Sequence, residues 1–279
     1  MPASPITAVL VHSPFLGPAS LRPLADALAA HGNSTEDLLA GSSINTEDLL
    51  AGSSNNTEDL LAGSSINAVL LDLRPSVVAA PMHQVLVGAF ADAMSELASE
   101  SLNTGEEDLA GPVVLIGHSG AGPLLPAFAD ALEDTVTGLV FVDAGLPTPG
   151  RSWRDTVPAE LYARLRSASR EGRLPRWQRW FQPDPLTELV TDEHLRAEIA
   201  DEAPEVPVAF LKEPRPDVEW DGPAGYVSLS GAYTGDVAAA EALGWPVRRL
   251  DTHHLAPATD PDPVAVAVLE VLAELLTAA

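Results

Sequence analysis

A serine stands at position 119 between small residues, directly after a short apolar run. Residues 113–116 read Val-Val-Leu-Ile, residues 117–122 read Gly-His-Ser-Gly-Ala-Gly, and a helix-like stretch, PLLPAFADAL, follows. This order predicts a buried strand, a tight turn and a helix, with the Ser119 hydroxyl exposed above the carboxyl end of a sheet. Such a serine can attack a carbonyl carbon while backbone N–H groups of the turn bind the oxyanion. The alternative is a glycine-rich turn with an incidental serine.

A serine nucleophile needs a base, and two adjacent histidines, His253 and His254, follow the last predicted strand. A carboxylate should bind the other ring nitrogen of that base, because it fixes the tautomer and stabilises the imidazolium. Asp143 ends an apolar run, and Asp236 lies in the loop after a later predicted strand. Both lie between the serine and the histidines in the chain. Either aspartate therefore gives a serine, an acid and a histidine in that order along the sequence.

Short apolar runs alternate with helical patterns along most of the chain. Strands are predicted at 6–11, 68–71, 113–117, 138–142, 226–229 and 246–250, and helices at 20–30, 83–97, 123–132, 236–243 and 263–276. Uninterrupted apolar strands joined by helices are typical of a parallel sheet covered on both faces. The sequence therefore predicts an α/β fold with a mostly parallel sheet of about six strands flanked by helices.

Residues 147–224 interrupt this alternation. The segment has no convincing strand, carries four of the five tryptophans, and includes amphipathic helix patterns at 161–165 and 195–199. We expect a helical lid inserted into a core of residues 1–146 and 225–279. The alternative is that its tryptophans only pack the segment onto the core. Four aromatic residues of the segment are predicted to line a hydrophobic substrate pocket: Trp153, Trp177, Trp180 and Phe181.

Residues 33–66 hold a tandem repeat with a period of 11 residues. TEDLLAGSSIN at 35–45 recurs as TEDLLAGSSNN at 46–56 and as TEDLLAGSSIN at 57–67. Each unit offers at best a turn or two of helix before its glycine, which is too short to be stable alone. We predict an acidic, mobile loop without a catalytic role. The alternative is an array that binds a protein partner.

The composition excludes several classes of partner. The net charge of −25 repels nucleic acid and anionic membranes. The absence of cysteine excludes disulfides and thiolate chemistry, and no two histidines have a metal-ligand spacing, so no metal site is expected. No apolar run could span a bilayer and no secretory signal is visible. We therefore expect a cytoplasmic protein.

The motifs and their order resemble the α/β-hydrolase superfamily, in particular its small bacterial esterase-like members. The resemblance covers residues 1–32 and 67–279, and the Gly-His-Ser-Gly-Ala-Gly turn is its most specific element. It implies a serine hydrolase without a cofactor, which cleaves a small hydrophobic ester or related acyl substrate through an acyl-enzyme. Two alternatives stay open: a cofactor-free lyase, isomerase or perhydrolase on the same fold, and a non-catalytic binding protein.

The resemblance also assigns the base and the acid. His254 is favoured over its neighbour because it stands seven residues before Pro261, the proline that opens the last predicted helix, as the family's histidine commonly does. The family usually places its acid just after the strand predicted at 226–229, which favours Asp236 slightly. A minority of the superfamily keeps its acid at the position of Asp143.

The oxyanion hole is the part of the family pattern from which this sequence departs. Gly120 offers one backbone N–H, and the family takes a second from the loop after the first strand. The expected position is held by Pro14, which has no N–H to donate. Ser13 or Phe15 is then expected to supply the second donor. Three further histidines are predicted to line the pocket: His12, His118 and His253.

Overall fold

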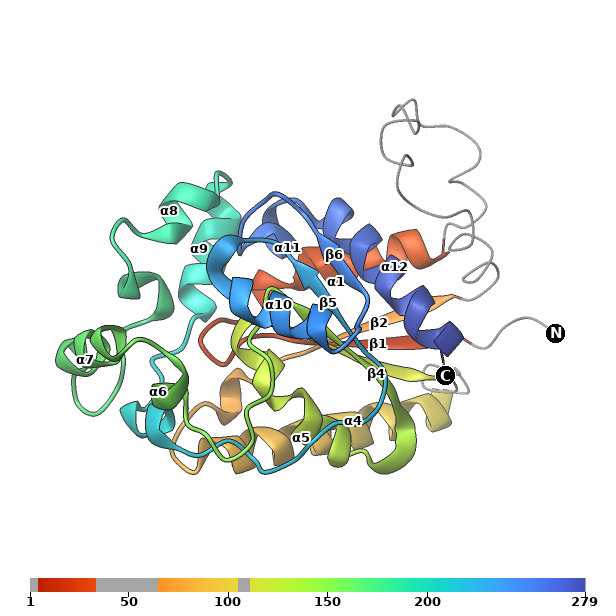
Figure 1. The fold of residues 1–279 in the computed structure, drawn as a ribbon, viewed down its shortest axis with the longest axis horizontal. Helices are drawn as coiled ribbons and strands as arrows, with labels where there is room; N and C mark the ends of the chain where they lie inside the picture. Colours follow the sequence, from red (N-terminus) through yellow and green to blue (C-terminus); the bar gives the residue numbers. More distant parts are fainter. Residues whose placement is uncertain (1–4, 34–64, 105–110, 279) are drawn as a thin grey trace.

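The computed structural model describes residues 5–33, 65–104 and 111–278. They form a six-stranded, all-parallel sheet in the order β2-β1-β3-β4-β5-β6 (Figure 1). The strands are β1 (Ile6–Val11), β2 (Ile66–Leu71), β3 (Val113–His118), β4 (Val136–Val142), β5 (Ala224–Ser228) and β6 (Val247–Arg249). The predicted parallel α/β fold is confirmed. The repeat of residues 33–66, predicted to be a mobile loop, lies almost wholly outside the described residues.

Helices cover both faces of this sheet. The core elements are α1 (Arg22–Asn33), α4 (Met82–Thr104), α5 (Leu125–Asp130), α10 (Thr234–Ala242), α11 (Ala256–Thr259) and α12 (Pro261–Ala278). Apolar side chains of α1 and α12 pack on one face, and those of α4, α5 and α10 pack on the other. Figure 1 shows α12 and α4 on opposite sides of the strands.

Burial on both faces explains the uninterrupted apolar strands of the sequence. Successive side chains of a strand point to opposite faces. Val9 and Leu115 accordingly pack in the cluster that contains α4, while Leu10 and Ile116 pack in the cluster that contains α12. All four side chains are essentially inaccessible to solvent.

The carboxyl ends of the central strands lie side by side. Val11 of β1 is paired with Gly117 of β3, and His118 of β3 is paired with Val142 of β4. Val142 is in turn paired with Val227 of β5. Loops that follow these strands therefore meet at one edge of the sheet, where ligands of open α/β sheets bind.

Residues 147–224 form a helical segment at this edge, as Figure 1 shows. Apart from its last residue, Ala224, with which β5 begins, it contributes nothing to the six-stranded sheet. Its helices are α6 (Trp153–Thr156), α7 (Ala159–Ala168), α8 (Pro185–Leu189) and α9 (Glu193–Glu202). The two amphipathic patterns of the sequence lie within α7 and α9.

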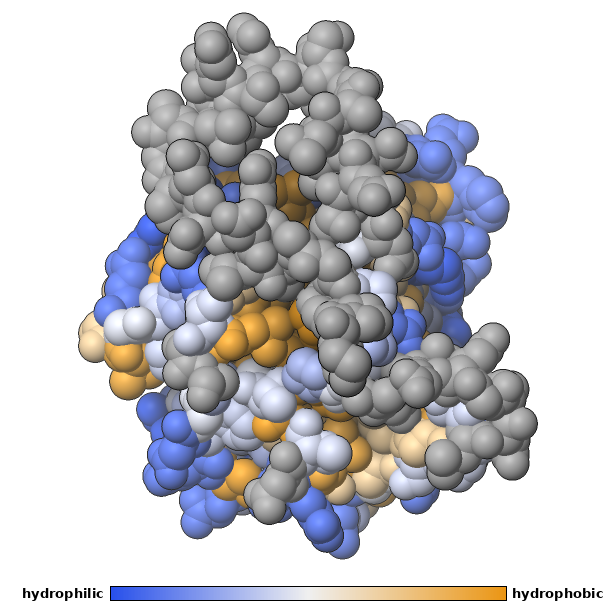
Figure 2. All heavy atoms as spheres, turned by 90° about the vertical axis from the view of Figure 1, so that its right-hand side faces the viewer, coloured by the Kyte–Doolittle hydropathy of each residue, from blue (hydrophilic) through white to orange (hydrophobic). Residues whose placement is uncertain are grey.

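Figure 2 shows the opposite end of the molecule, where hydrophobic and hydrophilic residues are interspersed among the atoms drawn in grey. Among the described residues, no helix combines the length and the apolar character needed to cross a membrane.

Candidate active site

The turn after β3 holds Ser119 in a strained backbone conformation. Ser119 has a φ of 57°, in the left-handed region that residues other than glycine rarely adopt. It begins a 3₁₀ helix, η3 (Ser119–Leu124). Close packing fixes the small residues of the turn, because a Cβ on Gly122 would lie 2.5 Å from the carbonyl oxygen of Gly145. The turn thus presents the Ser119 side chain at the carboxyl edge of the sheet.

Ser119, His254 and Asp143 form a continuous hydrogen-bonded chain. Nε2 of His254 lies 3.0 Å from Oγ of Ser119, and Nδ1 of His254 lies 2.7 Å from Oδ2 of Asp143. A carboxylate only accepts, so Nδ1 must carry a hydrogen that it donates to Asp143. Nε2 of the neutral ring is then an acceptor and takes the hydroxyl hydrogen of Ser119. The imidazole is therefore poised to remove the proton of Ser119.

Asp143 is fully buried and heavily hydrogen-bonded. Its Oδ1 accepts from the backbone N–H groups of Leu229 and Ser230, at 3.1 and 3.0 Å, and its Oδ2 accepts from the Ser230 hydroxyl at 2.6 Å. Burial by itself would raise the pKa of Asp143, but the bonds from His254, Ser230 and Leu229 outweigh it and hold that pKa well below its ordinary value. The carboxylate is therefore ionised and can stabilise an imidazolium.

The structure corrects the preference for Asp236 as the partner of the histidine. Asp236 lies in the first turn of α10, and its Oδ1 accepts from the backbone N–H of Leu146 at 2.8 Å. It therefore ties the start of α10 to the loop after β4, while Asp143 contacts the imidazole. The deciding feature is the strand pairing of His118 with Val142, which brings the residues that follow them, Ser119 and Asp143, to neighbouring strand ends.

His118 lies in the core beneath His254, and not on a pocket wall as predicted. The two rings have centroids 4.6 Å apart, and Nε2 of His118 lies 2.9 Å from the backbone carbonyl oxygen of His254, to which it donates. Burial, followed by the nearby His254, lowers the pKa of His118 to about 3, so the ring is neutral. Nδ1 of His118 has no hydrogen-bond partner among the described residues.

The other two predicted pocket histidines also have structural partners. His12 is buried, and its Nδ1 lies 2.9 Å from the carbonyl oxygen of Ser13 while its Nε2 accepts from the backbone N–H of Leu73 at 3.1 Å. His12 therefore fixes the loop after β1 from inside the core. His253 accepts a bond of 3.3 Å from the backbone N–H of Leu255, within the loop that carries the base.

The loop after β1 brings Ser13 and Phe15 beside the serine turn. Pro14 has no N–H, the N–H of Phe15 bonds to Oγ of Ser13 at 3.3 Å, and that of Leu16 bonds to the Ser13 carbonyl oxygen at 3.0 Å. A Cβ on Gly120 would lie 2.8 Å from Oγ of Ser13. The Ser13 hydroxyl, which keeps its own hydrogen after accepting from Phe15, therefore lies close to Gly120.

Aromatic side chains of the helical segment pack against this loop. The ring of Phe15 lies 4.8 Å from that of Trp180 and 6.3 Å from that of Trp153, both in edge-on arrangements. Trp153 and Trp180 also contact each other, with centroids 5.9 Å apart. These contacts bury apolar rings next to the loop that faces Gly120.

Two further aromatic residues of the segment lie on the histidine side. The ring centroid of Trp177 is 5.9 Å from that of His254, and Phe181 packs edge-on against Trp177 at 5.4 Å. Trp177 is buried, whereas Phe181 is 39% exposed. Of the four aromatic residues named from the sequence, Trp177 therefore contacts the proposed base directly, whereas Trp153 and Trp180 contact Phe15.

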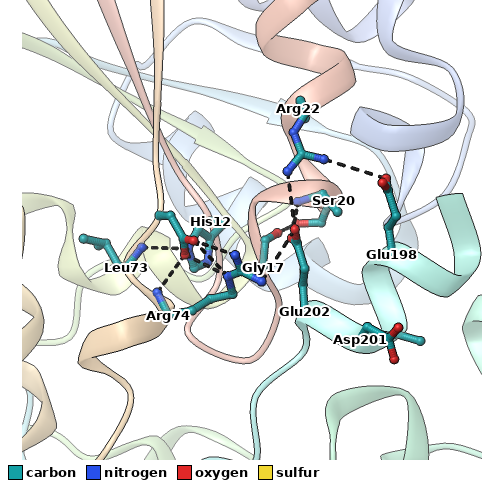
Figure 3. Close-up of polar contacts among 12 residues, drawn as sticks. His12, Gly17, Ser20, Arg22, Leu73, Arg74, Glu198, Asp201 and Glu202 are labelled. Atoms are coloured by element: carbon teal, nitrogen blue, oxygen red, sulfur yellow. Dashed lines mark hydrogen bonds and ion pairs between the residues drawn. The ribbon is translucent and has the colours of Figure 1, made fainter.

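A partly buried carboxylate joins the segment to the loop after β1, as Figure 3 shows. Oε2 of Glu202, at the end of α9, accepts from the backbone N–H of Ala19 at 2.6 Å, and Oε1 lies 3.3 Å from Arg22 and 3.5 Å from Arg74. A Cβ on Gly17 would lie 2.5 Å from Cβ of Glu202, so only glycine allows this close approach. Glu202 therefore anchors the helical segment to the loop that carries Ser13.

Comparison with known proteins identifies the fold. No family model matches the chain, and no curated protein matches it by sequence. An extracellular alpha/beta-hydrolase from a Paenibacillus species is 19% identical in sequence, with a TM-score of 0.63 over 96% of this chain and 99% of that one. The chain has the α/β-hydrolase fold.

Two further solved structures support this assignment. A pyrethroid hydrolase from Sphingobium faniae JZ-2 is 15% identical to this chain, with a TM-score of 0.58 over 98% of each chain. Polyneuridine aldehyde esterase is 15% identical, with a TM-score of 0.57 over 96% of this chain and 99% of that one. These structural neighbours of the chain are thus an esterase and other hydrolases.

Proposed function

We propose that this protein is a serine esterase that works through an acyl-enzyme on Ser119. The observation that carries the proposal is the chain of hydrogen bonds from Oγ of Ser119 through His254 to the ionised Asp143. A strained serine, a base in contact with it and a buried carboxylate behind the base are the groups that acyl transfer needs.

Acylation begins when Oγ of Ser119 attacks the ester carbonyl carbon and its proton passes to Nε2 of His254. The imidazolium is stabilised by Asp143, to which Nδ1 stays bonded. The tetrahedral intermediate then collapses, the bond to the alkoxy oxygen breaks, and His254 returns the proton to the leaving alcohol. Water repeats the sequence on the acyl-enzyme, releases the carboxylic acid and restores Ser119.

The oxyanion of the intermediate requires donors next to Ser119. The N–H of Gly120 lies in the first turn of η3 and has no partner within that helix, which leaves it available to a substrate oxygen. The second donor that we propose is the Ser13 hydroxyl, which lies beside Gly120 in place of the backbone N–H that Pro14 lacks. A side-chain donor can serve in an oxyanion hole as a backbone group does.

The preferred substrate that we propose is a small ester with an apolar acyl or alcohol group. Support comes from the rings of Phe15, Trp153 and Trp180, which pack together in and against the loop after β1, and from the ring of Trp177, which lies against His254. We propose that residues 147–224 act as the lid that carries these rings over the site. Glu202 would hold the lid in register with the loop of Ser13.

Hydrolysis of 4-nitrophenyl butyrate tests the proposal. The wild-type protein should release 4-nitrophenol, and Ser119→Ala should lower kcat by at least roughly 10⁴-fold. Ser95→Ala is the matched control, because Ser95 lies exposed on α4 and bonds only to the backbone of its own helix. Undiminished hydrolysis by Ser119→Ala would show that another group does the chemistry, and an inactive wild-type protein would contradict ester hydrolysis itself.

A further inference from the structure

A second hydroxyl group contacts the nucleophile. The phenol oxygen of Tyr233 lies 3.4 Å from Oγ of Ser119, and the ring of Tyr233 lies 5.8 Å from that of His254. Tyr233 ends a short 3₁₀ helix, η7 (Gly231–Tyr233), in the loop after β5. The sequence carries no motif that marks it.

The direction of this contact follows from counting hydrogens. The one hydroxyl hydrogen of Ser119 is taken by Nε2 of His254, since Nδ1 of that ring is committed as a donor to Asp143. Ser119 can therefore only accept from Tyr233. Burial raises the pKa of Tyr233 to about 12, so the phenol keeps its proton and is the donor.

The loop that carries Tyr233 is held in place at both ends. Ser230 is bonded to Asp143 by its N–H and its hydroxyl, and its Oγ also accepts from the backbone N–H of Ala232 at 3.2 Å. Three residues after Tyr233, Asp236 accepts from the N–H of Leu146 in the loop after β4. The hydroxyl is thus positioned by the same carboxylate that orients His254.

Tyr233 approaches Ser119 from the flank opposite to the oxyanion side. Ser13 and Phe15 follow β1, on one side of β3, whereas Tyr233 follows β5 and lies near Gly145, on the other side. Its hydroxyl therefore does not share the place of the Gly120 N–H and the Ser13 hydroxyl. The reacting atom within its reach is Oγ of Ser119.

We propose that Tyr233 is a catalytic residue that donates a hydrogen bond to Oγ of Ser119 and stabilises the negative charge that this oxygen gains as it loses its proton to His254. The bond is long in the resting protein. Catalytic hydrogen bonds are often long before substrate binds and shorten as charge develops. The role rests on the proposed use of Ser119 as the nucleophile, but not on the identity of the substrate.

The rate at which a fluorophosphonate labels Ser119 measures this role, because labelling forms the bond from Oγ to phosphorus with fluoride as the leaving group. Tyr233→Phe removes only the hydroxyl, and we expect its second-order labelling rate to fall roughly 10- to 100-fold, with kcat for 4-nitrophenyl butyrate lowered in parallel and KM little changed. Tyr162→Phe is the matched control, since the buried hydroxyl of Tyr162 has no partner among the described residues. It should label at the wild-type rate.

The outcomes separate this role from the proposed esterase activity. A Tyr233→Phe rate within about threefold of wild type overturns the inference, because a hydrogen bond to a charged oxygen is worth more than that. If the wild-type protein labels at Ser119 but hydrolyses no ester, the esterase proposal fails while the labelling rates still decide the role of Tyr233. If Ser119 does not label at all, both proposals fall.

Discussion

Ser119 and Asp143 each combine a strained backbone conformation with a side chain of the proposed triad. Both have a positive φ, 57° and 41°, and each directly follows a strand residue, His118 and Val142 respectively, of a pair of neighbouring strands. The paired strands therefore hold both residues in these strained conformations, and both side chains point toward His254. A residue in such a conformation persists only when its surroundings hold it there.

Substitution of each candidate aspartate by asparagine, one at a time, distinguishes their roles. Asp143→Asn keeps an oxygen for the N–H groups of Leu229 and Ser230 but loses the charge that orients and stabilises His254, so kcat should fall roughly 10³- to 10⁴-fold. Asp236→Asn keeps an acceptor for the Leu146 N–H and should stay within a few-fold of wild type. Steady-state kinetics on one ester check both variants. A larger loss of kcat in Asp236→Asn than in Asp143→Asn would make Asp236 the acid.

Ser13 carries the second prediction at this scale. Ser13→Ala removes the proposed side-chain donor to the oxyanion and should lower kcat roughly 10²- to 10³-fold, with a smaller effect on KM. Ser20→Ala is a suitable control, because the Ser20 hydroxyl bonds to the carbonyl oxygen of Gly17 in the same loop. If Ser13→Ala loses no more activity than Ser20→Ala, the second donor must be a backbone group.

His118 makes the stability of the fold depend on pH. Its pKa is lowered to about 3 in the folded protein from an ordinary 6.5, so between these values the unfolded chain binds a proton that the folded one does not. Stability is therefore lost as the pH falls through this window. His83 and His253, whose pKa values burial also lowers, act in the same direction.

The pH dependence of Tm tests this assignment. When the pH is lowered from 7 to 5, the Tm of His118→Asn should fall less than the Tm of the wild-type protein. The reason is that the variant lacks one of the groups that take up a proton only on unfolding. His194→Asn, a change at an exposed position on α9, should keep the wild-type dependence. An unchanged slope in His118→Asn would mean that the ring is protonated in the folded state.

At the scale of elements, the contact between α9 and the loop after β1 links the helical segment to Ser13, the proposed second oxyanion donor. Glu202 is only 16% exposed and accepts from a backbone N–H, whereas its neighbour Glu198 is 43% exposed and makes only an ion pair of 3.7 Å with Arg22. Exposed ion pairs contribute about 0–1 kcal/mol, and a bond to a buried charged group contributes more.

The two glutamates therefore form a matched pair for urea unfolding. Glu202→Ala should lower the free energy of unfolding by about 2 kcal/mol, since it leaves the Ala19 N–H without its acceptor. Glu198→Ala should cost less than about 1 kcal/mol. Equal losses for the two variants would argue against an anchor at Glu202.

The elements of the core could be read from the sequence because burial on both faces gives short, uninterrupted apolar runs. The exceptions have physical reasons. β2 begins at Ile66, within the last repeat unit, so its first residues were assigned to the loop. The helix predicted at 123–132 begins only at Leu125, because the tight turn after Ser119 continues as 3₁₀ helix through Pro123.

The site was less predictable than the sheet. Ser119 follows from a local pattern, and His254 follows from a spacing to Pro261 that the family resemblance implies. The choice of Asp143 depends on the register between β3 and β4, which the sequence does not state. The contact of Tyr233 with Ser119 depends on how its loop is pinned by Asp143 and Asp236, and no local pattern encodes that.

At the scale of the whole molecule, a deletion tests whether folding and ester hydrolysis need the repeat of residues 33–66. A Cβ on Gly32 of α1 would overlap the side chain of Ile66 of β2, so the two ends of the connection lie side by side. Replacement of residues 35–64 by a short Gly-Ser linker should therefore leave folding and ester hydrolysis intact. Loss of activity at an unchanged Tm would assign the repeat a role in the reaction.

The central claim is that Ser119 is the nucleophile of a triad with His254 and Asp143. Peptide mapping by mass spectrometry after reaction with a fluorophosphonate tests it most directly. We predict a single adduct on Ser119, no adduct in Ser119→Ala, and much slower labelling in His254→Ala and Asp143→Asn. An adduct on another residue, or labelling of Ser119 at an unchanged rate without His254, would contradict the account.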